Sequence, residues 1–256
     1  MKGKNAMKNK ISGKIVALLL TLIIVATSGM PIYAKETGDK ANSFRYENGQ
    51  PIAKAVPFST LSPNAWKKID GKYYSGDGSV IEGAVAKGID VSHHQGTVDW
   101  KKAKEDGVEF AIIRCGFGMN QTKQDDAQWF NNVKGCEENN IPYGVYLYSY
   151  ADTVKKAQSE AEHVLRLIKG HTLAYPVYYD IEEKAVLNKL TAEQLGKIAA
   201  TFVNKVKAEG YQTGIYSNKS NFETFLTDSQ FSQWNKWVAQ YNSAACTYKG
   251  TYQIWQ

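Results

Sequence analysis

The stretch "YPVYYDIEE", residues 175–183, decides the fold of this chain. It is typical of a buried strand, yet it ends in Asp180 and Glu182, and carboxylates are among the side chains least often buried without a partner. Side chains two residues apart in a strand point to the same face. At a rise of roughly 3.3 Å per residue, the two Cα atoms lie about 6.6 Å apart. The sequence therefore predicts two acids side by side at a strand end.

Further strands and helices alternate around this stretch. Apolar runs predict strands at 87–92, 109–116, 143–150, 175–182, 212–218, 236–242 and 252–256, and helices are expected at 99–107, 126–140, 153–170 and 191–210. This alternation predicts a parallel sheet covered by helices. Several strands end in polar residues, which favours a (β/α) barrel with its site at the carboxyl ends of the strands. No glycine-rich phosphate loop follows a strand, which argues against a nucleotide site.

The first 86 residues have a different character. Residues 1–34 are typical of a signal peptide, with five lysines before and at the start of an apolar core at 15–26. That core is shorter than the roughly 20 residues of a membrane span, although an uncleaved anchor is the alternative. Residues 35–64 are polar and are expected to be a flexible leader. The aromatic and glycine-rich residues 65–86 predict a small hairpin-like lead-in to a catalytic domain at 87–256.

Charge and cysteine content narrow the class of protein. The net charge is +6, and the signal lysines Lys2, Lys4, Lys8, Lys10 and Lys14 account for five of it. The rest is nearly neutral, so a nucleic-acid partner is not expected. Of the three cysteines, Cys115 and Cys136 could form a bridge that leaves Cys246 free, or all could be buried free thiols. Their spacing fits no zinc site.

A third carboxylate, Asp90, ends the first predicted strand and should reach the same rim. Where several carboxylates lie close together, their mutual repulsion raises the pKa of at least one of them. A general acid that works near neutral pH needs such a raised pKa in order to stay protonated. Such a set suits either glycosidic bond cleavage or a divalent metal, and solvated or capping acids are the bland alternative. Tyrosines on the strands favour sugar, because aromatic faces pack on the apolar faces of sugar rings. They are Tyr146, Tyr148, Tyr150 and Tyr178.

Several motifs identify a family when taken in order. The sequence resembles the family 25 glycoside hydrolases, which are lysozyme-like N-acetylmuramidases, and the resemblance covers 87–256. It implies a modified, flattened (β/α) barrel of the TIM type, in the α/β class. It also implies hydrolysis of the β-1,4 bond between N-acetylmuramic acid and N-acetylglucosamine, with no cofactor and no metal. The motifs are "KGIDVSHHQG" with "VDW", "FAIIRCGFG", "YGVYLYSYA", "YPVYYDIE", "GIYSN" and "WVAQY" with "YQIWQ".

The resemblance also implies roles for single residues. Glu182 would be the general acid, Asp180 would orient the substrate 2-acetamido group that acts as nucleophile, and Asp90 would assist electrostatically. Arg114 would hold Asp90 or a substrate carboxylate. His93 and His94 are expected at the rim rather than as metal ligands. The saccharide groove would be lined by Tyr148, Tyr216, Trp237, Gln240 and Tyr241.

The expected partner is the glycan strand of peptidoglycan, with the membrane involved only if the signal is uncleaved. The chain is expected to be a secreted monomer at the cell wall of a Gram-positive-type bacterium. Family members usually continue with a last strand that carries another acid in an Asp-x-Asn-like motif, so the barrel is expected to be C-terminally incomplete after Gln256. The alternatives are a non-catalytic wall-saccharide-binding protein of the same fold and a glycosidase acting on chitin-like chains.

Overall fold

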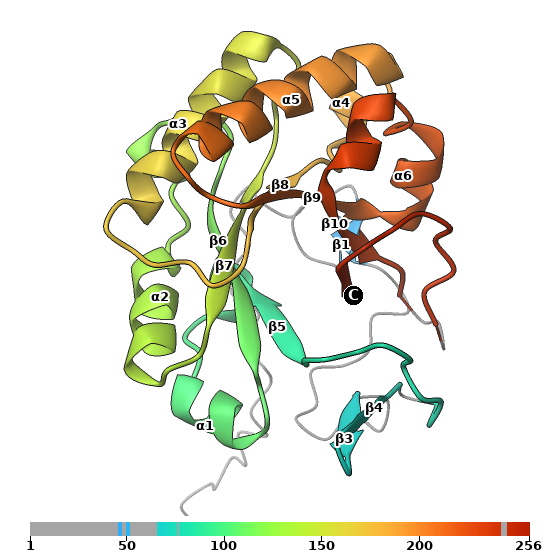
Figure 1. The fold of residues 1–256 in the computed structure, drawn as a ribbon. Helices are drawn as coiled ribbons and strands as arrows, with labels where there is room; N and C mark the ends of the chain where they lie inside the picture. The colour runs from blue at the N-terminus through green and yellow to red at the C-terminus, as the bar shows by residue number, and fades with distance from the viewer. Residues whose placement is uncertain (1–45, 48–49, 52–65, 76, 242–244) are drawn as a thin grey trace, which may run out of the picture. The chain divides into compact units, whose positions relative to one another are not determined.

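The computed structural model describes residues 46–47, 50–51, 66–75, 77–241 and 245–256. Their centre is a seven-stranded parallel sheet in the order β11-β10-β9-β8-β7-β6-β5, curled as a half-barrel with helices packed on its outer side (Figure 1). The α/β class and the TIM-type architecture are therefore confirmed. The strands are β5 (Gly88–Val91), β6 (Phe110–Phe117), β7 (Tyr143–Tyr148), β8 (Val177–Asp180), β9 (Thr213–Asn218), β10 (Asn235–Ala239) and β11 (Ile254–Trp255).

Helices connect these strands and cover the sheet. α3 and α5 lie side by side across the outer face, and α1 and α2 follow β5 and β6 (Figure 1). The α-helices are α1 (Trp100–Glu105), α2 (Trp129–Glu138), α3 (Val154–Ile168), α4 (Lys184–Leu187), α5 (Ala192–Ala208) and α6 (Lys219–Thr224). Short 3-10 turns are η2 (His93–Gln95), η3 (Thr122–Gln124) and η4 (Ser229–Gln233).

Side-chain alternation along the strands builds two separate apolar clusters. In β8, Val177 and Tyr179 face the helices, and Tyr179 stacks on Phe202 of α5 with ring centroids 3.9 Å apart. Tyr178 and Asp180 point the other way, as a period of two requires. The concave side of the sheet thus has its own cluster, which is mostly aromatic. It comprises Phe110, Ile112, Tyr146, Tyr178, Tyr216, Trp237 and Ala239.

The helix predictions hold with one error. The capping box of Thr191 and Gln194 starts α5, as expected. In α3 the residues that face the core include Ala157, Ala161, Val164 and Ile168. Val154, expected on the same face, is 47% exposed because it lies in the first turn, whereas the buried residues occupy the later turns. The helix also buries two polar side chains, Glu160 and His163, which the apolar pattern does not reveal.

A hairpin precedes the sheet. β3 (Lys67–Ile69) and β4 (Lys72–Tyr74) pair antiparallel, and the carboxylate of Glu109 holds them against the start of β6. It accepts hydrogen bonds from Lys68 Nζ (2.5 Å), Tyr73 Oη (2.7 Å) and the backbone N–H of Lys87 (2.8 Å). Burial opposes ionisation of Glu109, but the bonds from Lys68 and Tyr73 lower its pKa to about 2.

The remaining described residues before the hairpin form one small element, in which β1 (Tyr46–Glu47) and β2 (Gln50–Pro51) pair antiparallel. The expected signal peptide, and most of the expected leader, lie outside the described residues. Within the described ranges, no helix is both long and apolar enough to cross a membrane.

The cysteines are free thiols, so the bridge between Cys115 and Cys136 is wrong. Both are fully buried in the core between the sheet and the helices, where Cys115 Sγ donates to the carbonyl of Tyr146 (3.3 Å). Burial raises the pKa of Cys136 to about 12, which disfavours the thiolate that disulfide formation needs. These cysteines therefore serve as small core residues.

Candidate active site

The carboxyl ends of the strands bring a row of side chains into register. Tyr148 of β7 pairs with Asp180 of β8, Asp180 with Tyr216 of β9, and Tyr216 with Trp237 of β10. Partners in adjacent parallel strands lie on the same face of the sheet, so this row crosses the concave side. Asp180 has no exposed surface. This row forms the base of the candidate site. The charge of Glu182 acts on Tyr148 and Tyr216, so Glu182 lies next to the row.

Glu182 follows β8 and shares the face of Asp180, because the backbone between them stays extended. The N–H of Ile181 donates to Tyr216 O (3.0 Å), and Ser217 Oγ donates to Ile181 O (2.6 Å). Burial, together with the negative charges of Asp90 and Glu183, raises the pKa of Glu182 to about 8. Glu182 is therefore mostly protonated at neutral pH and can donate a proton.

Asp90 joins the site from β5, at the opposite end of the sheet order from β11. Its Oδ2 accepts a hydrogen bond from Gln256 Nε2 at 2.7 Å, so the residue after β11 reaches the end of β5. Burial raises the pKa of Asp90 to about 6. The negative charge of Asp90 also acts on Glu182, so ionisation of Asp90 favours the protonated form of Glu182. The curl of the sheet thus brings together acids that are 92 positions apart in the sequence.

The three predicted groove tyrosines form hydrogen bonds at this edge. Tyr148 Oη donates to Glu183 Oε2 (3.2 Å), and Glu183 also caps α4 by accepting from Ala185 N. The helix cap is therefore Glu183, and not Asp180 or Glu182, for which capping was the alternative. Tyr216 Oη lies 3.1 Å from Tyr241 Oη. Burial raises the pKa of Tyr148 and of Tyr216 well above 10, so both keep their hydroxyl protons.

The other two predicted groove residues, Trp237 and Gln240, make contacts within the protein. Trp237 is only 3% exposed, and its ring packs edge-on against Tyr146 (5.7 Å between centroids) and Tyr178 (5.5 Å). It therefore supports the base of the candidate site and leaves little ring surface for a ligand. The side chain of Gln240 folds back on Thr247, whose N–H donates to Gln240 Oε1 (2.8 Å). A saccharide contact by either residue stays a prediction.

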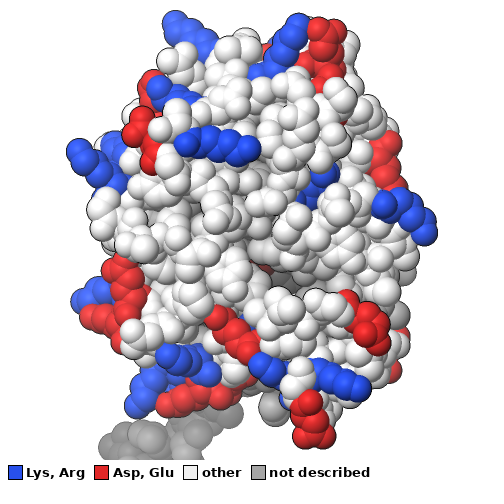
Figure 2. All heavy atoms as spheres, in the orientation of Figure 1, with Lys and Arg blue, Asp and Glu red and all other residues white. Residues whose placement is uncertain are grey.

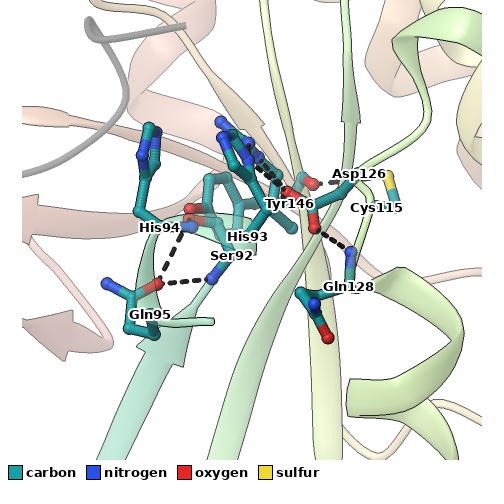
Figure 3. A network of polar contacts seen from close by, with 9 residues as sticks. Ser92, His93, His94, Gln95, Cys115, Asp126, Gln128 and Tyr146 are labelled. Carbon is teal, nitrogen blue, oxygen red and sulfur yellow. Dashed lines mark hydrogen bonds and ion pairs between the residues drawn. The ribbon is translucent and has the colours of Figure 1, made fainter. Parts of the chain in front are cut away.

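Arg114 is fully buried and points at an acid that the sequence did not single out. Its Nε donates to Asp126 Oδ2 (2.6 Å), and a second guanidinium nitrogen meets His93 Nδ1. The N–H of His93 also donates to Asp126 Oδ2 (3.0 Å), and the two residues lie side by side in Figure 3. Burial alone would raise the pKa of Asp126, but the hydrogen bonds from His93 and the charge of Arg114 lower it to about 2. This network ties the end of β5 to the loop after β6.

The face of the molecule seen in Figure 2 carries few charges near its middle, where it is hollowed. Side chains of both signs, lysines and arginines as well as acids, gather mainly around its margin. Within the described ranges, no three histidine, cysteine or acidic side chains are grouped to hold a metal ion. The arrangement offers a protonated acid, two further carboxyl groups and tyrosine hydroxyls, which is a set suited to acid-catalysed bond cleavage.

Comparison with known families agrees with this geometry. The model for glycosyl hydrolases family 25 matches residues 89–256, which include all seven strands except the first residue of β5. The chain belongs to glycosyl hydrolase family 25.

Proteins named as lysozymes and autolysins, and a solved family 25 structure, resemble part of the chain. An autolytic lysozyme of Clostridium acetobutylicum is 28% identical over 155 residues, which are 60% of this chain and 45% of that protein. The modular autolysin LytC of Streptococcus pneumoniae is 32% identical and superposes with a TM-score of 0.64, covering 75% of this chain and 47% of LytC. A second LytC structure holds a synthetic peptidoglycan ligand. A family 25 glycosyl hydrolase of Bacillus anthracis shares the fold, at 19% identity, a TM-score of 0.59 and coverage of 67% of this chain and 78% of that one. The chain spans about half the length of the first two relatives.

The site of this family 25 member contains residues that sequence reasoning missed. Asp126 follows another acid, Asp125, in a loop, and nothing local separates their partners: Asp125 binds His163 and Arg166, whereas Asp126 binds Arg114. Glu183 was passed over although it adjoins Glu182. No local signal marks its role, because glutamate is not among the residue types preferred just before a helix.

Proposed function

We propose that this chain is a secreted peptidoglycan hydrolase, a muramidase that cleaves the β-1,4 bond between N-acetylmuramic acid and N-acetylglucosamine. The observation that carries the proposal is the raised pKa of Glu182, next to Asp90 and Asp180, in a family 25 fold. Relatives named as lysozyme and autolysin support the choice of substrate. The chain would act as a monomer on wall glycan, outside the cell.

In the proposed reaction, Glu182 gives its proton to the leaving glycosidic oxygen as the bond to the anomeric carbon breaks. The carbonyl oxygen of the substrate 2-acetamido group attacks that carbon, and Asp180 orients the acetamido N–H. Water then opens the cyclic intermediate and loses a proton to the Glu182 carboxylate, so configuration is retained. Distances between enzyme carboxylates do not predict the stereochemistry where the substrate supplies the nucleophile.

The test is release of reducing ends from purified peptidoglycan, with masses of the products. Glu182→Gln is expected to lower the rate about a hundredfold or more, since a general acid typically contributes that much. Glu193→Gln, on the exposed surface of α5, is the matched control and should keep the wild-type rate. New ends that are N-acetylmuramic acid identify a muramidase, and N-acetylglucosamine ends identify another specificity. Binding without turnover, equal in wild type and Glu182→Gln, would replace the proposal with a wall-binding protein.

A further inference from the structure

A β-bulge in β6 places Phe117 on the concave face of the sheet, where Phe110 of the same strand also lies. Arg114 pairs with Tyr146, but the next pairs are Gly116 with Leu147 and Phe117 with Tyr148, so Cys115 is an extra residue. Without the bulge, residues three apart would face opposite sides of the sheet. With it, Arg114 and Phe117 both face the concave side, and the Arg114 guanidinium carbon lies 5.8 Å from the centre of the Phe117 ring. Bulges beside active sites commonly redirect a side chain in this way.

The bulge extends to β6 the row of side chains that crosses the concave side and contains Asp180. Phe117 pairs with Tyr148, and Tyr148 pairs with Asp180, so Phe117 is two strands from Asp180 in the same row. Neighbouring strands are about 4.8 Å apart, which puts the Phe117 backbone roughly 10 Å from that of Asp180. A ring seated on Phe117 would therefore be separated from the reacting bond by another ring.

Tyr150 completes an aromatic corner at this position. Its ring meets Phe117 edge-on (6.3 Å between centroids) and lies 4.9 Å from the ring of Tyr148. Phe117 and Tyr150 are both half-buried, so each keeps part of its ring accessible. Met119, which is 37% exposed, lies two residues beyond Phe117, just after β6. The corner combines apolar ring faces with a phenol hydroxyl, as sugar-binding surfaces do.

Buried polar contacts hold this corner in place. The N–H of Tyr150 donates to Glu160 Oε1 (2.9 Å), and Glu160 Oε2 accepts from Ser149 Oγ (2.8 Å) and Tyr179 Oη (2.5 Å). Glu160 has no exposed surface. On the other strand, Gly118 N donates to Tyr148 O (2.9 Å). The backbone of both aromatic residues is therefore fixed before any ligand arrives.

We propose that Phe117 and Tyr150 form a saccharide subsite, which takes the pyranose ring of an N-acetylhexosamine one ring beyond the sugars at the carboxylates. This inference rests on the proposed function, since it assigns part of the same glycan to the end of β6. The subsite makes affinity depend on the length of the glycan. It uses stacking on Phe117 and does not require the peptide stem of the wall.

The test measures binding of peptide-free glycan fragments of two, four and six sugars to the Glu182→Gln protein, which does not consume them. Adding Phe117→Ala or Phe117→Leu should weaken six-sugar binding about tenfold, with a smaller loss for two sugars, while Phe117→Tyr restores it. Phe130→Ala, a matched change on a 68% exposed residue of α2, should have no effect. Thermal melting of each variant identifies misfolding, and Phe117→Leu keeps an apolar side chain of more similar size if Phe117→Ala unfolds.

Equal losses at all three lengths, no loss, or no binding of any fragment would each overturn the subsite. Failure of the proposed function has a different signature. If the wild-type chain released no reducing ends while six-sugar binding still depended on Phe117, the subsite would stand and the hydrolase would not.

Discussion

Asp126→Asn should destabilise the fold by an amount that depends on pH. The Asp126 side chain has no exposed surface and accepts a 2.6 Å bond from Arg114. Its pKa falls from an ordinary 3.8 to about 2, and that difference corresponds to about 2 kcal/mol of unfolding free energy at neutral pH. Asparagine keeps the shape but leaves the Arg114 charge without its carboxylate, a change that costs about 3–5 kcal/mol at buried pairs.

The sign of the pH effect follows from the lowered pKa. Folded Asp126 binds its proton less tightly than unfolded Asp126, so its stabilising contribution is complete above the unfolded pKa of 3.8. It is lost as pH falls through about 2. At pH 3 roughly half of it remains, so the gap between wild type and Asp126→Asn should narrow by about 1 kcal/mol relative to pH 7.

Urea unfolding at pH 7 and pH 3 measures both quantities. Asp106→Asn, at an exposed helix end, is the control and should change stability by less than about 0.5 kcal/mol at either pH. A gap for Asp126→Asn that is the same at both pH values would refute the electrostatic reasoning. The loss would then come from packing or hydrogen bonding alone.

Three other outcomes are expected. Because Glu182 must be protonated and its pKa is about 8, reducing-end release at pH 9 should be roughly a tenth of the plateau below pH 7, and a flat profile would exclude Glu182 as the acid. Burial raises the pKa of Glu160 to about 7 from an ordinary 4.5, so wild type should lose melting temperature as pH rises from 4.5 through 7, whereas Glu160→Gln should lose less. On α3, Val164→Ala should cost about 2 kcal/mol in urea unfolding because Val164 is fully buried, and Val154→Ala, at a 47% exposed site, less than about 0.5 kcal/mol. Equal costs would mean that the helix packs differently.

The sequence pattern was sufficient for the strands and for the acids at their ends. An apolar run followed by a polar residue is a local signal, and β8 with Asp180 and Glu182 illustrates it. The bulge at Cys115 could not be predicted, because it is a relation between two strands rather than a property of one. The sequence also could not predict that Arg114 binds Asp126. Whether Asp125 or Asp126 reaches Arg114 depends on how the loop after β6 turns.

The order of the strands has a consequence for how the molecule forms. All neighbouring strands in the sheet are also consecutive in the chain, from β5 to β11. Each pairing can therefore form as soon as the next segment is available, and its loop closure spans one crossover rather than several strands. The bond from Gln256 to Asp90 joins residues 166 positions apart, so it can form only after the strands between them have been placed. Asp90 thus gains this partner later than the strands gain theirs, and the edge that carries Asp90 would assemble after the rest of the sheet.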